Sequence, residues 1–203
     1  MTENVGPVDE APAARASGPG RWLADARRVD ESVYAAIATT PTPALDVGMG
    51  RLSRTANKSV LWISTAAVLA AVGGRPGRRA AAQGLVSVAV SSAVVNLGIK
   101  QAARRRRPDR EGALVPQGRH VPMPTTHSFP SGHSASAFAF ATGVAHQLPP
   151  VAAPLYALAG VVGYSRVHTG VHYPGDVVVG ALLGTVIAQL TTQAMERHAA
   201  PVG

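Results

Sequence analysis

Four long stretches of the chain carry no Asp, Glu, Lys or Arg, and this pattern limits the possible folds more than any other feature. They cover residues 59–74, 80–99, 134–165 and 177–195. A helix needs ~20 apolar residues to cross the hydrocarbon core of a bilayer, and 80–99 and 177–195 hold 20 and 19. Only 15% of all residues are charged, which is too few to cover the outer faces of a soluble helical bundle. The sequence therefore predicts a membrane protein.

The four stretches divide into about five predicted membrane spans. A proline pair at 149–150 splits 134–165 into two helices joined by a short turn. Residues 59–74 are slightly short for a span, but Lys58 and Arg75 can extend it by reaching toward the headgroups. The predicted fold is thus an all-α, polytopic membrane helical bundle, with the bilayer as a partner and a multi-pass location in the cell membrane.

Glycines mark two further features of this bundle. Residues 73–77, Gly-Gly-Arg-Pro-Gly, predict a tight turn between the first two spans. Gly180 and Gly184 form a small-xxx-small pattern in the last span, which allows two helices to approach closely in lipid. The same pattern is common by chance in spans rich in Ala and Gly.

The segment before the spans has a different character. Residues 1–20 are polar and rich in Pro and Gly, which predicts a disordered tail. Residues 21–58 are interpreted as an amphipathic helix and a linker, 59–196 as the membrane domain and 197–203 as a short tail. Apolar residues recur at helical spacing in 21–38, namely Trp22, Leu23, Ala26, Val29, Val33, Ala36 and Ile37. Such a helix can lie in the membrane interface or pack on the domain's own surface.

The net charge of +8 points to an anionic partner, such as nucleic acid, an anionic lipid or a phosphorylated substrate. Taken alone, the four arginines at 104–107 indicate nucleic acid or anionic lipid. The predicted spans favour lipid, and no nucleic-acid partner is expected. The chain has no cysteine, so thiolate metal sites and a cysteine nucleophile are excluded.

Polar residues with chemical potential fall at the same ends of the predicted spans. Lys100 follows the second span, His133 opens the third, Arg166 and His172 follow the fourth, and Asp176 opens the fifth. In an up-and-down bundle these ends lie on one membrane face. Charged groups gathered there are a functional hypothesis by default.

Two histidines and one carboxylate suit phosphoryl transfer through a histidine nucleophile. An imidazole can attack phosphorus directly, and a carboxylate on its other ring nitrogen fixes the tautomer and stabilises the developing charge. Asp176 lies four residues after His172 and can serve in this way. His133 can donate a proton to the leaving oxygen.

The same face offers several groups that can bind phosphate oxygens. Lys100, Arg107 and Arg166 supply positive charge, and arginine can also bind bidentately. Residues 131–133, Ser-Gly-His, lie where a helix begins, so backbone N–H groups and the helix dipole favour an anion there.

These residues form three motifs that resemble those of the type-2 phosphatidic acid phosphatase family, which also includes bacterial acid phosphatases and vanadium haloperoxidases. The motifs are Lys100-(six residues)-Arg107-Pro108, Pro130-Ser131-Gly132-His133 and Ser165-Arg166-(five residues)-His172-(three residues)-Asp176. All three are present in order and with the family's spacing. Residues 1–58 lie outside the resemblance.

The resemblance implies a role for each motif residue. It implies His172 as nucleophile, Asp176 as its orienting partner and His133 as general acid. It further implies that no metal or other cofactor is required and that water hydrolyses the phosphohistidine. The implied phosphate ligands are Lys100, Arg107, Ser131, Gly132 and Arg166.

The same residues resemble other kinds of site. His168, His172 and Asp176 would form a metal-binding face on a helix, but Gly170 and the Pro-Gly pair at 174–175 interrupt the segment, so His168 is expected in a loop. Ser131 beside His133 could be a serine nucleophile, but the surrounding Gly-x-Ser-x-Gly pattern is missing. Arg104, Arg105 and Arg106 are left for lipid headgroups or for positioning, since the family pattern does not separate them.

The sequence thus predicts a membrane phosphatase acting on a lipid phosphate or diphosphate. The candidate substrates are phosphatidic acid, phosphatidylglycerophosphate, a polyprenyl diphosphate and a polyprenyl-phosphoryl sugar phosphate. The high Ala, Arg and Gly content suggests a GC-rich bacterium, which favours a cell-wall polyprenyl carrier. A non-enzymatic lipid-binding scaffold and a vanadate-dependent haloperoxidase are the alternatives. The oligomeric state and the membrane face of the site stay open.

Overall fold

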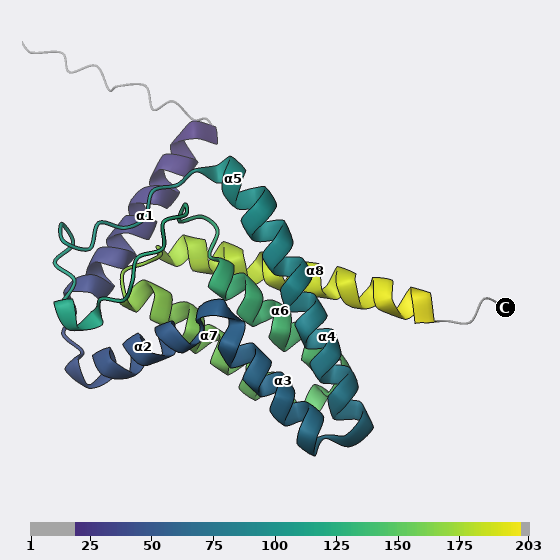
Figure 1. Ribbon diagram of the computed structural model, residues 1–203. Helices are drawn as coiled ribbons and strands as arrows, with labels where there is room; N and C mark the ends of the chain where they lie inside the picture. The colour runs from purple at the N-terminus through teal and green to yellow at the C-terminus, as the bar shows by residue number, and fades with distance from the viewer. Residues whose placement is uncertain (1–18, 200–203) are drawn as a thin grey trace, which may run out of the picture.

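The computed structural model describes residues 19–199, whose regular elements are all helical, with no β-strand in that range (Figure 1). Residues 104–131 form a long loop with a single 3₁₀ turn. The helices are α1 (Pro19–Thr39), α2 (Pro43–Thr55), α3 (Val60–Val72), α4 (Gly74–Ala93), α5 (Lys100–Ala103), α6 (Gly132–Gln147), α7 (Ala152–His168) and α8 (Pro174–Ala199). Three short 3₁₀ turns lie at Asn57–Ser59, Gln117–Arg119 and Pro149–Val151. A π-helical segment, Val94–Ile99, joins α4 to α5 without a break. The prediction of an all-α membrane bundle is confirmed.

Two helices in the described part of the chain are long and apolar enough to cross a membrane. They are Gly74–Ala103, which combines α4, the π-helical segment and α5, and Pro174–His198, which is α8. The bent pair of α2 and α3 makes a third if it acts as one span. The predicted count of about five is not confirmed, because α6 and α7 hold only 16 and 17 residues.

The turn between α3 and α4 is tighter than predicted. The sequence indicated a turn over 73–77, but α4 already begins at Gly74, whose φ of +58° an L side chain rarely adopts. Pro76 fits the first turn of a helix, where its missing N–H is not needed. A Cβ on Gly77 would overlap the carbonyl oxygen of Leu69, so this glycine lets α3 and α4 cross closely.

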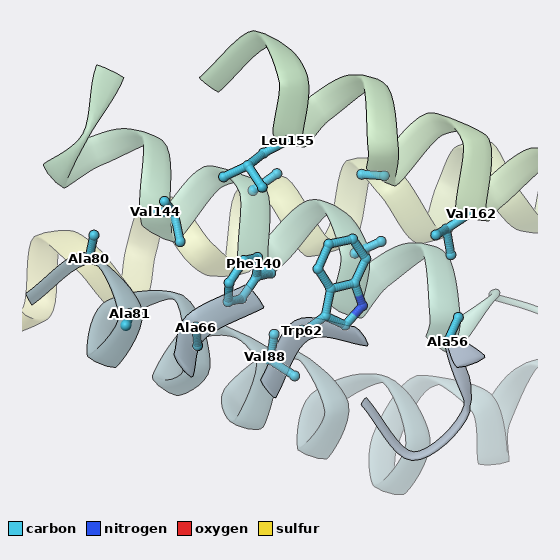
Figure 2. Packing of buried hydrophobic residues seen from close by; sticks show 13 residues of the cluster. Ala56, Trp62, Ala66, Ala80, Ala81, Val88, Phe140, Val144, Leu155 and Val162 are labelled. Atoms are coloured by element: carbon cyan, nitrogen blue, oxygen red, sulfur yellow. The ribbon is translucent and has the colours of Figure 1, made fainter. Parts of the chain in front are cut away.

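Helix α6 lies at the centre of the bundle and packs against α4, α7 and α8. Its Phe140 ring lies 5.2 Å from the ring of Trp62, and both side chains are fully buried (Figure 2). Alanines and valines from α3, α4 and α7 surround this pair. Because lipid tails are as apolar as these side chains, close van der Waals packing between small residues is what holds the helices together.

Hydrogen bonds between buried amides and hydroxyls add to this packing. Gln83 Nε2 of α4 donates to Thr192 Oγ1 of α8 at 2.6 Å, and Gln147 Nε2 of α6 donates to Gln83 Oε1 at 2.7 Å. These bonds join three helices away from the motif residues. A polar group in an apolar interior needs such a partner, so the three helices are fixed relative to one another.

Helix α1 lies across the end of the bundle where α8 begins (Figure 1). Tyr34 and Ala38 are buried, whereas Trp22, Val29 and Val33 on another side of the helix are exposed. One side of α1 therefore packs on the protein, and its apolar stripe is exposed except at Ile37, which packs against the Tyr34 and Ala38 cluster. Interfacial placement of that stripe stays a prediction.

Most residues of the two predicted tails lie outside the described range. Most of the predicted N-terminal tail, residues 1–18, lies outside the described residues. At the other end, α8 continues to Ala199, past the predicted start of a tail at 197. Residues 200–203 also lie outside the described range.

The glycine pattern of α8 generates a first prediction. A Cβ on Gly184 would overlap the carbonyl oxygen of Ala135 in α6, and one on Gly180 would lie 2.5 Å from the carbonyl oxygen of Ser131, the N-cap of α6. We expect Gly184→Ala to destabilise the protein by about 1–3 kcal/mol, because the methyl group forces α8 away from α6. The thermal unfolding midpoint in detergent measures this effect.

Gly160→Ala is the matched control. This glycine lies on α7, and a Cβ there would meet no atom within 4 Å. Its midpoint should stay at the wild-type value. Equal midpoints for the two variants would show that α6 and α8 do not need this close approach.

Candidate active site

A cavity of about 250 Å³ opens between the α2–α3 corner, the end of α4, the start of α6 and the loop that carries His172. Five of the eight predicted site residues line it, namely Lys100, Arg107, Gly132, His133 and His172. The other three, Ser131, Arg166 and Asp176, are buried outside its lining. The three motifs thus come together at one end of the bundle, as the sequence predicts.

His172 lies in the short connection between α7 and α8. Gly170 has φ +69°, which lets the chain reverse directly after α7. Pro174 then starts α8, and Asp176 lies in its first turn. The Nδ1 atom of His172 lies 3.4 Å from Asp176 Oδ2, and both side chains are buried. The same carboxylate oxygen accepts a hydrogen bond from the backbone N–H of Tyr173 at 2.9 Å.

The other ring nitrogen of His172 faces an arginine. Arg107 Nη1 lies 3.3 Å from His172 Nε2. A guanidinium can only donate, so in this contact Nε2 carries a lone pair. The proton then resides on Nδ1, where Asp176 accepts it. This tautomer leaves the nitrogen next to Arg107 available as a nucleophile at the cavity wall.

Burial lowers the pKa of His172 to about 4. The hydrogen bond to Asp176 opposes this shift, while the positive charges of Arg107 and Arg166 add to it. The ordinary histidine pKa is ~6.5. Since the pKa of His172 lies well below that value, its ring is neutral at pH 7. A neutral imidazole is the form that can attack an electrophile.

Arg107 is fixed by carbonyl groups from two loops. Its Nε donates to the carbonyl oxygen of Thr126 at 2.8 Å, and its Nη1 donates to that of Val171 at 2.7 Å. Nη2 donates to the carbonyl oxygen of His127 at 3.2 Å. Dipoles rather than a carboxylate hold the guanidinium, so its positive charge is not neutralised and can attract an anion in the cavity.

His133 and Lys100 occupy further parts of the cavity wall, each next to an asparagine. His133 Nε2 lies 2.8 Å from Asn57 Oδ1, and Lys100 Nζ donates to Asn96 Oδ1 at 3.5 Å. The sequence reasoning missed both asparagines. The sequence could have indicated Asn96, because this residue lies four positions before Lys100 on one continuous helix. Asn57 gave no signal, because it belongs to a segment without motifs.

Ser131 is the N-cap of α6 and does not face the cavity. Its Oγ accepts hydrogen bonds from Ser134 N at 3.4 Å and from Ser134 Oγ at 3.0 Å. Its own N–H donates to the carbonyl oxygen of Asp176 at 2.9 Å, which joins the starts of α6 and α8. Gly132 follows it at the cavity wall, so the positive end of the α6 dipole lies at the cavity. A serine nucleophile is not supported.

Arg166 is buried behind the cavity. Its Nη1 donates to Ser53 of α2, at 2.8 Å to the carbonyl oxygen and 2.6 Å to Oγ. Its Nε has no hydrogen-bond partner. The implied phosphate contact of Arg166 stays a prediction, since this residue is not part of the cavity lining.

His168 is not a loop residue, contrary to expectation, but the last residue of α7. The chain stays helical up to that point because Gly170, and not His168, makes the turn. The Nε2 atom of His168 lies 3.0 Å from Asp46 Oδ1, and Asp46 also accepts a bond from Arg119 Nε at 2.8 Å.

His168 and His172 therefore contact different carboxylates, so the helical metal face is not formed. Among residues 19–199, moreover, no group of three or more His, Asp or Glu side chains is arranged to hold a metal ion.

The structure distinguishes the surroundings of Arg104, Arg105 and Arg106, which the sequence alone did not. Arg104 and Arg106 are exposed. Arg105 instead contacts Asp176 Oδ1 through Nη1 at 2.8 Å. Its guanidinium also lies over the ring of Tyr173, 4.1 Å from the ring centroid.

The protonation of His172 gives a prediction that requires no substrate. We expect ¹⁵N NMR of histidine-labelled protein to show His172 neutral at pH 6.5, with the proton on Nδ1. Its pKa should lie near 4, because burial disfavours the imidazolium. A variant with His172→Gln assigns the signal. Titration near pH 6.5 or a proton on Nε2 would contradict this geometry.

Comparison with known proteins identifies the family of this chain. The family model described as the PAP2 superfamily matches residues 80–199. The decaprenylphosphoryl-5-phosphoribose phosphatase of Mycolicibacterium smegmatis is 32% identical over 160 residues, which cover 78% of this chain and 84% of that protein.

The Mycobacterium tuberculosis protein of the same name is 40% identical over 98 residues, or 45% of this chain. That match spans 49% of the M. tuberculosis protein's length.

A solved structure has the same arrangement of helices. The crystal structure of Aquifex aeolicus LpxE superposes with a TM-score of 0.64 at 26% sequence identity, and the match covers 81% of this chain and 95% of that one. The family match includes all three motifs and the helices that hold them. The chain therefore belongs to the PAP2 superfamily, the type-2 phosphatidic acid phosphatases that its motifs resemble.

Proposed function

We propose that this protein is a membrane phosphatase that releases inorganic phosphate from the headgroup of a lipid. The observation that carries the proposal is His172, whose Nδ1 contacts the buried Asp176 and whose Nε2 lies beside Arg107 at a cationic cavity. Membership of the PAP2 superfamily and the phosphatase names of its relatives support it.

In the first step, the lone pair of His172 Nε2 attacks the phosphorus atom. A P–N bond forms and the bond from phosphorus to the leaving oxygen breaks. His133, protonated when the negative charge of the bound phosphate offsets the burial and the neighbouring cations that lower its pKa, donates a proton to that oxygen. The rest of the lipid leaves as an alcohol, or as a lipid monophosphate when the substrate is a diphosphate. Asp176 accepts the Nδ1 proton in a hydrogen bond and stabilises the positive charge of the phosphorylated ring.

Charge on the non-bridging oxygens grows in the transition state, and the cavity wall is suited to stabilise it. Lys100 and Arg107 supply cations, and Gly132 brings the positive end of the α6 dipole to the same space. These donors are fixed before the substrate arrives, so they need little reorganisation during the reaction. Arg166 lies behind them and can add to the positive potential.

In the second step, water attacks the phosphohistidine. His133, now neutral, accepts a proton from this water as the P–N bond breaks. Inorganic phosphate leaves, and both histidines return to their starting protonation states.

The size of the cavity limits how much of the substrate it can enclose. At about 250 Å³ it lies below the ~300–1,000 Å³ of pockets that enclose a whole small ligand. The cavity therefore suits a phosphorylated headgroup while the tails stay in the bilayer. Among the four lipid classes considered, we place a polyprenyl-phosphoryl sugar phosphate first, because the M. smegmatis relative is named for such a substrate.

A phosphate-release assay with purified protein tests the proposal. The panel contains phosphatidic acid, phosphatidylglycerophosphate, a polyprenyl diphosphate and a polyprenyl-phosphoryl sugar phosphate, each in detergent micelles. We expect turnover of at least one, with the sugar phosphate fastest. Loss of the nucleophile in His172→Ala should lower kcat by about 10⁴-fold.

His146→Gln is the control, since this half-exposed histidine pairs with Glu196 away from the cavity. Its rate should equal that of the wild type. Binding of all four lipids without turnover would contradict the proposal and indicate a scaffold. Halide oxidation on addition of vanadate, without phosphate release, would indicate a haloperoxidase.

The covalent step has its own test. The wild type is mixed with ³²P-labelled substrate, and the reaction is stopped rapidly without acid. The protein should then carry labelled phosphate that is stable in alkali and lost in acid. His172→Ala should trap none. An active wild type that never carries protein-bound phosphate would point to direct attack by water instead.

A further inference from the structure

Asp176 has contacts on both carboxylate oxygens, and only one of them involves His172. Its Oδ2 atom contacts His172 Nδ1 and accepts a hydrogen bond from Ser128 Oγ. Its Oδ1 atom receives Nη1 of Arg105 at 2.8 Å. The side chain of Asp176 is fully buried, so these contacts and not water set its orientation.

Arg105 is itself held by a carboxylate from α1. Its Nη2 lies 2.7 Å from Asp30 Oδ2, and its guanidinium stacks on Tyr173. The side chains of Arg105 and Asp30 are 22% and 12% exposed, so solvent weakens this ion pair much less than a surface pair. A single guanidinium thus bridges a helix outside the motif region and the carboxylate of the dyad.

The second oxygen of Asp30 fixes the start of α8. Asp30 Oδ1 accepts a hydrogen bond of 2.6 Å from the backbone N–H of Gly175, next to Asp176. A carboxylate at a helix N-terminus is electrostatically favourable. A Cβ on Gly175 would lie 3.0 Å from Asp30 Oδ2, so the glycine leaves room for the carboxylate.

We propose that Asp30 and Arg105 are positioning residues for the dyad of His172 and Asp176. Without Asp30, Arg105 is free to turn toward the phosphate cavity or solvent, and Asp176 loses the partner of Oδ1. The carboxylate can then rotate away from Nδ1, and the tautomer of His172 is no longer fixed. This inference rests on the proposed function, and it removes Arg105 from the predicted lipid-headgroup contacts.

Two other roles would fit some of the same contacts. Asp30 could act only as a tether that docks α1 on the bundle. Arg105 could bind the substrate's headgroup. A tether affects stability and leaves turnover unchanged, whereas a headgroup ligand affects KM. A positioning role lowers kcat and changes the state of the His172 ring.

Kinetics of Asp30→Asn and Arg105→Gln in the full chain separate these roles. Each change should lower kcat about tenfold to a hundredfold. Arg105→Gln removes the charge-assisted hydrogen bond to Asp176, and Asp30→Asn removes the one that holds Arg105 in place. KM should stay within about twofold. The double variant should be no slower than the slower single variant, since both residues act through one carboxylate. Asp30→Glu, which keeps the charge, should recover part of the rate.

Each residue has a matched control. Asp25→Asn changes an exposed carboxylate of α1 that pairs with Arg21 and Arg28 at the surface. Arg78→Gln changes an exposed arginine of α4 away from the cavity. Both controls should keep the wild-type kcat. A thermal unfolding curve for every variant shows whether it is folded.

A second measurement does not depend on turnover. The ¹⁵N NMR signal of His172 should shift in Asp30→Asn and stay unchanged in Asp25→Asn. An unchanged signal in folded Asp30→Asn would overturn the positioning role even if no substrate is turned over.

The kinetic outcomes decide the rest. A wild-type kcat in Asp30→Asn with a lower unfolding midpoint would show a tether only, and a raised KM with unchanged kcat in Arg105→Gln would show a headgroup ligand. Either result overturns the inference while leaving the proposed function intact, provided that His172→Ala abolishes phosphate release. Failure of the wild type to turn over any lipid phosphate would instead overturn the proposed function.

Discussion

The buried carboxylate of Asp176 is the group on which the rest of the site depends. A charge removed from water is costly unless partners compensate it. Here His172, Arg105 and Ser128 supply those partners from three different parts of the chain. The backbone oxygen of the same residue accepts a bond from Ser131 at the start of α6. Asp176 therefore fixes the relative position of two helix starts and two loops as well as the histidine ring.

The bundle must hold α6 and α8 very close for these contacts to form. The chain achieves this with glycines rather than with large apolar residues. Gly180 and Gly184 of α8 face backbone oxygens of α6, and any side chain there would push the helices apart. Small residues are the expected solution in lipid, where the hydrophobic effect does not drive helices together. The close approach then brings the N-terminus of α6 to the cavity, so helix packing and the proposed phosphate binding both depend on one helix contact.

Much of this site could be predicted from the sequence because its parts are local. The offset of four between His172 and Asp176 is visible in the sequence itself, and the placement of Lys100 and His133 at the ends of uncharged stretches follows from the charge pattern. The contacts from Asp30, Ser53 and Asn57 could not be predicted, since they come from the segment outside the motifs and depend on how α1 and α2 fold back. The span count is not confirmed for a related reason. Helix α6 is enclosed by its neighbours, and an enclosed helix is uncharged even when it is too short to cross a bilayer.

The structure contains two clusters of the same chemistry, and their comparison shows what makes one of them a candidate active site. His172 contacts an aspartate that is paired with Arg105, and His168 contacts Asp46, which is paired with Arg119. Both histidines are buried, and they lie four residues apart. The cluster of His168 connects α2, α7 and the turn at Gln117–Arg119, and none of its members lines the cavity. Residue type and hydrogen bonding are thus nearly the same in the two clusters. The difference is that Nε2 of His172 faces the cavity side, where a phosphate can reach it, whereas Nε2 of His168 is occupied by its own carboxylate.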